Sequence, residues 1–246
     1  MKKIISLNVN GFRGEYQNGE LVPDSKLISN LKQLKEFIDK LDMDDESVVL
    51  LQEIPHEIYR KFSEGYEWIE NEMFNMFKQL FEEDYKIFYP KNLIHSQQCT
   101  VAVGTKNTKW KYSEVQIIQY DEKYSYGNKI VEIEIDGKLL LGIHMNPCDK
   151  MWNMILEGGK NKKPAYVVGD FNSYEKRGKM KDKPKQLRQL GYYPCVPSNV
   201  ITDFRDMSSL DNLYLDENIC LQNGLKVNIY KPKEFVTDHA VCIFEF

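Results

Sequence analysis

Ala165-Tyr166-Val167-Val168-Gly169-Asp170-Phe171-Asn172 is an apolar run that ends in a polar cluster. Residues 165–168 predict a buried β-strand, with the polar cluster at its end. Other short polar clusters also end apolar runs: Asn8-Val9-Asn10-Gly11, Gln52-Glu53, His144-Met145-Asn146 and Thr237-Asp238-His239. Side chains from distant segments meet at strand ends, so we expect these clusters to form one cleft.

Short apolar strands recur on both sides of this run, with helices between them. The spacing of apolar residues predicts helices over 25–41, 55–62, 70–82, 149–156 and 183–190. It predicts strands over 3–9, 47–52, 85–89, 100–105, 115–120, 129–135, 139–145, 165–168, 212–215, 225–229 and 240–246. Asp136-Gly137 signals a tight hairpin turn between two of them. We expect a single α/β domain over residues 1–246, with two sheets packed face to face and helices outside.

Composition limits the classes of protein. The chain has 246 residues, 42% of them hydrophobic, which is enough for one large domain. Its net charge of -4 gives no global attraction to nucleic acid, so such binding would come from local patches. The 5 cysteines are scattered, which favours free thiols in a reducing compartment. No apolar run is long enough for a signal peptide or a membrane span, so we expect a cytoplasmic protein, most simply a monomer.

The residue types in the clusters suit phosphate-ester chemistry. Glu53, Asp170 and the asparagines offer the hard oxygen ligands that Mg²⁺ or Mn²⁺ prefers. His144 and His239 could transfer protons and stabilise charge in a phosphoryl transition state. Each cluster alone also fits a turn or a helix cap. Motifs for a P-loop, a dinucleotide site and a serine-hydrolase elbow are lacking.

Taken in order, the clusters resemble the motifs of the endonuclease/exonuclease/phosphatase superfamily over nearly the whole chain. The matching segments are Ser6–Gly11, Leu50–Glu53 (its metal-binding Leu-Gln-Glu), Gly169–Asn172 (its Gly-Asp-Phe-Asn), Ser209–Leu213 (its Arg-Ile-Asp-Tyr-Ile) and Thr237–Val241 (its Ser-Asp-His). Leu210 and Thr237 depart from the usual Arg and Ser. The resemblance implies a four-layer α/β/β/α sandwich with two mixed, mostly antiparallel sheets, and a metal-dependent phosphoric ester hydrolase.

The resemblance also implies the metal-binding residues. Glu53 would be the principal ligand of Mg²⁺ or Mn²⁺, with Asn8 beside it. Asp238 would be a further ligand or would support one.

Catalytic roles follow from the same resemblance. Asp170 would position or deprotonate the attacking water, and Asn172 would orient the substrate and Asp170. His239 would face the scissile phosphate, held by Asp211, because a carboxylate fixes the tautomer of an imidazole. Whether Asp170 or His239 is the general base stays open.

His144 favours one branch of the superfamily. The deoxyribonuclease I, sphingomyelinase and phosphatase branches carry a His on this strand, whereas the exonuclease III and apurinic-endonuclease branch tends to carry Asn. His144-Met145-Asn146-Pro147 therefore resembles the first group. A packed strand-end histidine is the alternative. His56 and His95 are expected to be ordinary surface or loop residues.

Two features bear on the substrate. Ten basic residues against three acidic ones lie between Lys160 and Arg188, around Asp170 and Asn172. They could form a phosphate-binding rim or a solvated lysine-rich loop. Tyr120, Tyr124 and Tyr126 could stack on bases or pack at a sheet edge.

Three functions are therefore open. The first is a nuclease or related phosphodiesterase acting on DNA or RNA. The second is a phosphatase or phosphodiesterase acting on a small-molecule, inositide or lipid phosphate ester. The third is a non-catalytic binding protein on the same fold, against which the complete set of site residues argues.

Overall fold

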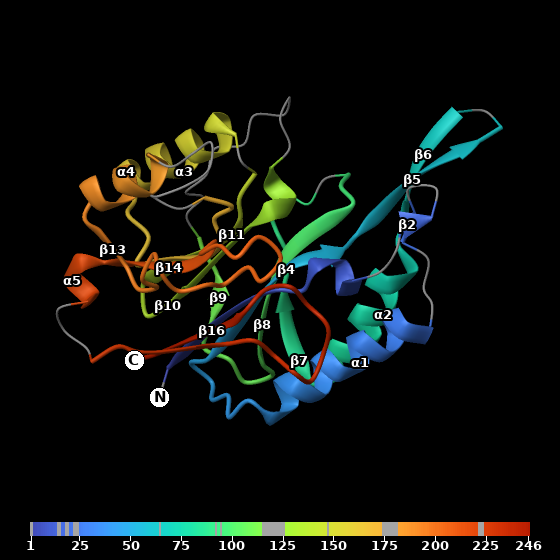
Figure 1. The fold of residues 1–246 in the computed structure, drawn as a ribbon, viewed down its shortest axis with the longest axis horizontal. Helices are drawn as coiled ribbons and strands as arrows, with labels where there is room; N and C mark the ends of the chain where they lie inside the picture. Colours follow the sequence, from blue (N-terminus) through green and yellow to red (C-terminus); the bar gives the residue numbers. More distant parts are fainter. Residues whose placement is uncertain are drawn as a thin grey trace.

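Two six-stranded sheets form the centre of the molecule in a computed structural model (Figure 1). It describes residues 2–13, 16–17, 20–21, 25–63, 65–91, 93, 95–114, 126–146, 148–173, 182–220 and 224–246. Within the first sheet the order is β15-β16-β1-β4-β8-β7, and β1 and β4 are parallel neighbours. Its strands are β15 (Lys226–Tyr230), β16 (Val241–Glu245), β1 (Lys3–Asn8), β4 (Val48–Pro55), β8 (Gln98–Thr105) and β7 (Tyr85–Phe88).

The second sheet has the order β13-β14-β12-β11-β10-β9. Its strands are β13 (Tyr192–Pro194), β14 (Asp211–Asp216), β12 (Tyr166–Asp170), β11 (Lys138–His144), β10 (Ile130–Ile135) and β9 (Lys111–Tyr112). Only the β11–β12 pair is parallel within this described sheet. Both sheets are thus mixed and mostly antiparallel, as expected.

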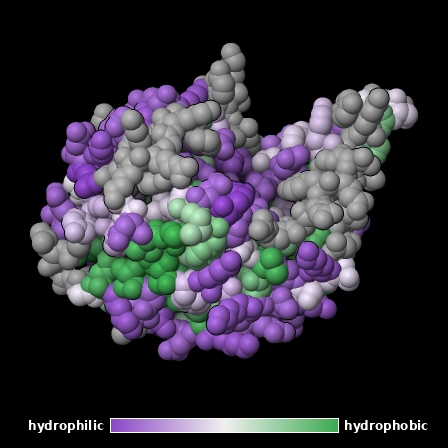
Figure 2. All heavy atoms as spheres, in the orientation of Figure 1, coloured by the Kyte–Doolittle hydropathy of each residue, from purple (hydrophilic) through white to green (hydrophobic). Residues whose placement is uncertain are grey.

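Helices cover the outer face of each sheet. Helices α1 (Ser25–Lys40) and α2 (Glu72–Phe81) pack on the first sheet, and α3 (Asp149–Asn161) and α4 (Lys183–Gln189) pack on the second (Figure 1). On the face shown in Figure 2, hydrophilic side chains lie over the helices, as expected for helices with one side in solvent, and a hydrophobic patch lies between the two helical layers. None of the described helices is long and apolar enough to cross a membrane.

Three apolar clusters separate these four layers. In β4, Val49 and Leu51 face α1 and α2, while Val48 and Leu50 face the second sheet. This alternation follows from the two-residue period of a strand, and it explains why both faces of β4 are apolar. A third cluster, including Trp152, lies between the second sheet and α3 and α4. The four-layer α/β/β/α sandwich is therefore confirmed.

The remaining short elements lie at the edges. They are the 3-10 turns η1 (Asn10–Arg13) and η2 (Gly127–Lys129), helix α5 (Glu217–Cys220), and the strand pairs β2 (Tyr16–Gln17) with β3 (Glu20–Leu21) and β5 (Glu57–Phe62) with β6 (Gly65–Glu70).

The helix expected over residues 55–62 was wrong, because this segment is strand β5 of a projecting hairpin (Figure 1). Tyr59 lies opposite Trp68 in the hairpin, and their ring centroids are 5.1 Å apart. Such cross-strand aromatic pairs stabilise a hairpin, and the pairing of β5 with β6 overrides the apolar spacing that predicted a helix. The expected strand over 115–120 lies outside the described residues.

Candidate active site

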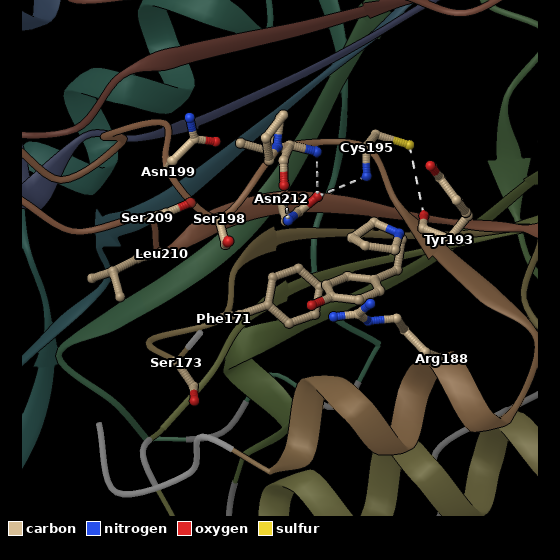
Figure 3. A pocket seen from close by; sticks show the side chains of 14 residues that line it. Phe171, Ser173, Arg188, Tyr193, Cys195, Ser198, Asn199, Ser209, Leu210 and Asn212 are labelled. Atoms are coloured by element: carbon tan, nitrogen blue, oxygen red, sulfur yellow. Dashed lines mark hydrogen bonds between the residues drawn. The ribbon is translucent and has the colours of Figure 1, made fainter. Parts of the chain in front are cut away.

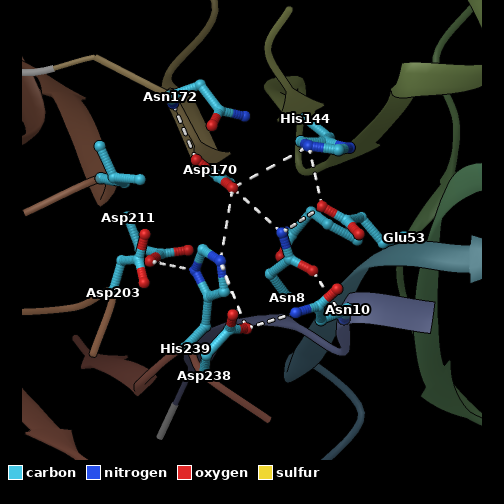
Figure 4. Close-up of polar contacts among 12 residues, drawn as sticks. Asn8, Asn10, Glu53, His144, Asp170, Asn172, Asp203, Asp211, Asp238 and His239 are labelled. Carbon is cyan, nitrogen blue, oxygen red and sulfur yellow. Dashed lines mark hydrogen bonds and ion pairs between the residues drawn. The ribbon is translucent and has the colours of Figure 1, made fainter. Parts of the chain in front are cut away.

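Polar side chains from both sheets meet at one end of the sandwich (Figure 4). Asn8 ends β1 and Glu53 lies near the end of β4 in the first sheet. His144 ends β11 and Asp170 ends β12 in the second, where they are register partners. The expected convergence of strand ends therefore occurs, and it joins segments that are up to 229 residues apart in the sequence.

The Asn8 amide lies between the two carboxylates. Its Nδ2 atom donates hydrogen bonds to Oε1 of Glu53 and Oδ2 of Asp170, both at 3.0 Å. Its Oδ1 atom accepts from the backbone N–H of Asn10 at 2.8 Å. In this orientation Asn8 presents a donor to the carboxylates, so it holds them beside each other rather than offering its own oxygen.

The backbone at the site is in a sparsely populated conformation. Glu53 has φ of 60° and Asn172 has φ of 45°. This left-handed region suits Asn but is uncommon for Glu, so the surrounding structure must hold it. The register of β4 against β8 shifts between Leu51 and Ile54, as in a β-bulge, which redirects the Glu53 side chain.

Gly169 places Asp170 next to His144. Its φ is 141°, and a side-chain Cβ there would collide with the carbonyl oxygen of Ile143 on β11. Only glycine permits both the conformation and the close approach. Asp170 Oδ1 then accepts from the backbone N–H of Asn172 at 2.8 Å. The Asn172 amide donates in turn to the Met145 carbonyl at 2.8 Å.

His239 is held by Asp211 in the interior. Its Nδ1 lies 2.9 Å from Oδ2 of Asp211, and its Nε2 lies 4.0 Å from Oδ2 of Asp170. Burial alone would lower the pKa of His239, but Asp211 and, more weakly, Asp170 raise it to about 10. His239 is therefore an imidazolium at neutral pH, and its Nε2–H points toward Asp170. Thr237 supports this geometry, since its hydroxyl donates to the carbonyl of Asn8 at 2.7 Å.

The other two titratable groups behave differently. Burial, then Lys129 and His239, lower the pKa of His144 well below its ordinary value. Burial and the nearby Asp211 raise the pKa of Asp170 to about 6, against the opposing effect of His239. The pKa values of the two imidazoles in this site are thus shifted in opposite directions.

Within the described part of the chain, two groups of donor atoms are close enough to bind a cation. One contains Glu53, His144 and Asp170, and the other contains Asp170, Asp211 and His239, with each set of atoms within 4.8 Å of one another. The first group includes two carboxylates that share the Asn8 amide, which is the oxygen-rich donor set that Mg²⁺ or Mn²⁺ prefers. The residues present therefore fit a divalent cation.

Asp238 lies outside both groups. Its Oδ1 atom accepts from Nδ2 of Asn10 at 2.7 Å, and its Oδ2 atom lies 3.5 Å from Nη1 of Arg205. A direct role for Asp238 as a ligand stays a prediction. Asp238 instead anchors Asn10 and Arg205 beside the carboxylates.

Two basic side chains of this site were not expected from the sequence. Arg205 lies in the loop before β14, and Lys129 lies 3.3 Å, from Nζ to Nδ1, from His144. The position of Lys129 was predictable from the sequence, because β10 and β11 form a hairpin and a residue just before β10 must lie beside the end of β11. The sequence around Arg205 offers no such indication. His56 is buried against Phe74 rather than at the surface, and neither it nor the exposed His95 belongs to either donor group.

The basic stretch is only partly described. Lys163, Lys183 and Lys185 form ion pairs with Asp216, Asp149 and Asp182. These lysines are therefore engaged locally. Residues 174–181, which carry four of the basic positions, lie outside the described part of the chain, as do Tyr120 and Tyr124.

A pocket of about 440 Å³ lies beside β14 and α4 (Figure 3). Phe171, Leu210 and Asn212, neighbours of Asp170 and Asp211 in the sequence, contribute to its wall. Arg188 lines it from α4 (Figure 3). The hydroxyl of Ser173 is buried there and has no hydrogen-bond partner among the described residues, which end at Ser173 and resume at Asp182. Such a hydroxyl is costly unless a ligand or water satisfies it, so the pocket suits a partly polar group.

The fold is that of the endonuclease/exonuclease/phosphatase superfamily. An AP endonuclease from Archaeoglobus fulgidus is similar with a TM-score of 0.63 and 12% identity, over 100% of this chain and 99% of that one. A family protein from Leptotrichia buccalis has a TM-score of 0.62 and 17% identity over the same shares. D. rerio TDP2, solved with a single-strand DNA product, has a TM-score of 0.58 and 15% identity over 100% and 99%. No family model and no curated protein matches the sequence.

Proposed function

We propose that this protein is a divalent-metal-dependent phosphodiesterase that hydrolyses nucleic acid. The observation that carries the proposal is the junction of Glu53 and Asp170, which come from different sheets and share the Asn8 amide at 3.0 Å. A buried imidazole lies on either side, with Nε2 of His144 and Nε2 of His239 within 4.0 Å of Asp170. Carboxylates in such proximity repel each other, and a bound cation would relieve that repulsion.

Nucleic acid is favoured as the substrate by the structural relatives. One is an AP endonuclease, and another was solved with a single-strand DNA product. The chain is acidic overall, so a nucleic-acid strand would be held by local cations such as Arg205 and Arg188. We propose Mg²⁺ or Mn²⁺ as the cofactor on the basis of the oxygen donors.

The proposed mechanism assigns each residue a task at the phosphate. A bound cation would supply Lewis-acid stabilisation of the phosphoryl oxygens. Glu53 and Asp170 would hold it, and Asn172 would keep Asp170 oriented. His239 is held protonated by Asp211, so it would donate a hydrogen bond to a phosphoryl oxygen rather than accept a proton. This favours Asp170 as the group that positions and deprotonates the attacking water.

The second candidate function is hydrolysis of a small phosphate ester. It is favoured by the pocket beside Asp211, because a concave site of about 440 Å³ would hold a nucleoside or a small headgroup. Both candidate functions use the same carboxylates, so they differ only in the chemical group that is attached to the scissile phosphate.

A substrate panel separates these functions. The protein with Mg²⁺ or Mn²⁺ would be incubated with plasmid DNA, single-stranded DNA, RNA, bis-p-nitrophenyl phosphate and p-nitrophenyl phosphate. We expect cleavage of at least one nucleic acid and of the diester, and loss of both in Asp170→Asn. Asp136→Asn, in the hairpin turn between β10 and β11, is the matched control and should retain full activity. If the native protein hydrolyses none of these substrates, the remaining alternative is a non-catalytic binding protein.

A further inference from the structure

Lys129 brings a cation into contact with one of the candidate catalytic histidines. It ends the 3-10 turn η2 just before β10, whose Ile130 pairs with Ile143 of β11. This register places Lys129 beside His144, and the Lys129 Nζ lies 3.3 Å from Nδ1 of His144. The contact comes from the hairpin itself, so it is a built feature of the site.

The other ring nitrogen of His144 faces acceptors. Its Nε2 lies 3.3 Å from Oε1 of Glu53 and 3.9 Å from Oδ2 of Asp170. An ammonium group has only donors, and a carboxylate has only acceptors. One neutral tautomer satisfies both sides: Nδ1 keeps its lone pair and accepts from Lys129, and Nε2 carries the hydrogen and faces Glu53.

The Nδ1 atom of His239 has the opposite hydrogen-bonding role to the Nδ1 atom of His144. Its Nδ1 lies 2.9 Å from the acceptor Asp211, so Nδ1 is the donor there. The two histidines of the site therefore have different neighbours at the same ring atom: a cation for His144 and a carboxylate for His239.

We propose that Lys129 is a positioning residue that holds His144 in the Nε2–H tautomer, which makes His144 a hydrogen-bond donor and prevents it from ligating the metal. A ring nitrogen that carries a hydrogen has no lone pair for a cation. The group Glu53, His144 and Asp170 then supplies carboxylate oxygens alone to the metal. Such a site favours hard cations over zinc, for which imidazole is a good ligand. The inference rests on the proposed function in one respect: that function makes a phosphate the group to which His144 would donate its hydrogen bond.

The tautomer can be measured without substrate or metal. The chain has 4 histidines, so ¹⁵N long-range correlation spectra of the metal-free protein are simple, and the His144→Gln spectrum assigns the signal of His144. We expect a protonated Nε2 and an unprotonated Nδ1 at pH 7.5. Lys129→Met should give a mixture of tautomers, and Lys129→Arg should restore the single tautomer because guanidinium is also donor-only. Lys2→Met, at a half-buried lysine bonded to Tyr166, is the matched control and should change nothing.

Metal binding gives an independent measurement. Lys129→Glu places an acceptor beside Nδ1, so it should move the hydrogen to Nδ1 and free Nε2 for a metal. We expect its Zn²⁺ affinity to rise at least about tenfold, with the His144 signal shifted on binding. The affinity for Mn²⁺ and the affinity for Mg²⁺ should each be the same in the native protein and in His144→Gln.

The outcomes separate this inference from the proposed function. Lys129→Met should lower kcat about tenfold with a smaller change in KM, and Lys129→Arg should recover it. A native His144 with the hydrogen on Nδ1 would overturn the inference, since it would leave Nε2 free to ligate. This result does not depend on the folding of any Lys129 variant. Normal hydrolysis with an unchanged tautomer in Lys129→Met would overturn the inference alone. A tautomer change in a protein that hydrolyses no phosphodiester would uphold the inference and refute the function.

Discussion

Nδ1 of His239 and Oδ2 of Asp211 lie 2.9 Å apart, and both side chains are buried at 3% and 0% exposure. This pair couples the stability of the fold to the charge needed at the phosphate. Removal of one partner would leave a buried charge without compensation, which is strongly destabilising.

We predict that the pair gives a distinctive pH dependence of stability. The pKa of His239 is raised from 6.5 to about 10, so the folded state holds the proton more tightly than the unfolded state. The stabilisation is complete below about pH 6.5 and is lost as pH rises toward about 10. Urea unfolding of the metal-free protein between pH 7 and 9 should show a decline of about 1 kcal/mol per pH unit relative to an uncharged pair.

The reference for that measurement is the double variant His239→Gln/Asp211→Asn, which keeps a hydrogen bond but has no charge. Its free energy of unfolding should not change with pH in this range, once the contribution of groups that titrate in both proteins, such as Lys2 with a pKa of about 8, is subtracted. Asp170 titrates below the range, since its pKa is about 6. Parallel curves for native and double variant would show that His239 is not held protonated.

Asp211 also sets the activity. Asp211→Asn should lower kcat by at least ~100-fold, because acid–base groups of this kind contribute roughly 10²–10⁴-fold in rate. KM and Mn²⁺ affinity should change little, as Asp211 does not touch the Glu53 donors. Asp216→Asn, at the far end of β14 and paired with Lys163, is the control and should keep the native kcat. Equal rates for the two variants would remove Asp211 from the mechanism.

Gly169 tests the backbone that positions Asp170. Gly169→Ala forces a Cβ against the Ile143 carbonyl at φ of 141°, so it should cost several kcal/mol of folding free energy or abolish expression. Gly137→Ala, in the hairpin turn at φ of 70° with open space around it, should cost only about 1 kcal/mol. Thermal unfolding of both proteins makes the comparison. Similar melting temperatures would mean that β11 and β12 are not held as closely as described.

The pocket lined by Arg188 predicts discrimination between substrates. Arg188→Gln should raise KM about tenfold for thymidine 5′-p-nitrophenyl phosphate and leave bis-p-nitrophenyl phosphate unaffected. Lys185→Gln, on the same helix but outside the pocket wall, should change neither. An equal effect on both substrates would assign Arg188 to general electrostatics rather than to a subsite.

Most of the strands could be predicted because their apolar residues are local signals. Residues 48–51, 101–103 and 139–143 are continuous or nearly continuous apolar runs. The Asp136-Gly137 turn has positive φ at both positions, as a tight hairpin requires. Residues 57–62 have no such signal, since their conformation depends on pairing with 65–70. The same holds for the three-residue strand β13, which exists only as the partner of β14.

The candidate site was predictable where a motif ended a strand, and less so elsewhere. Asp170, His144 and His239 were expected to face one cleft, and their side chains meet in the structure. What the sequence does not contain is orientation: the Asn8 amide, expected to offer an oxygen, donates through nitrogen instead. The sequence also does not show the opposite pKa shifts of the two histidines, because these depend on Lys129 and Asp211 at contact distance.

The most direct test of the central claim is the rate of bis-p-nitrophenyl phosphate hydrolysis with Mn²⁺, then with excess EDTA, then with Mn²⁺ restored. The Glu53–Asp170 junction predicts a rate that disappears in EDTA and returns with the metal. It predicts at least a ~100-fold loss in Asp170→Asn when Mn²⁺ is present. A rate that persists in EDTA, or an Asp170→Asn protein as active as the native one, would contradict it.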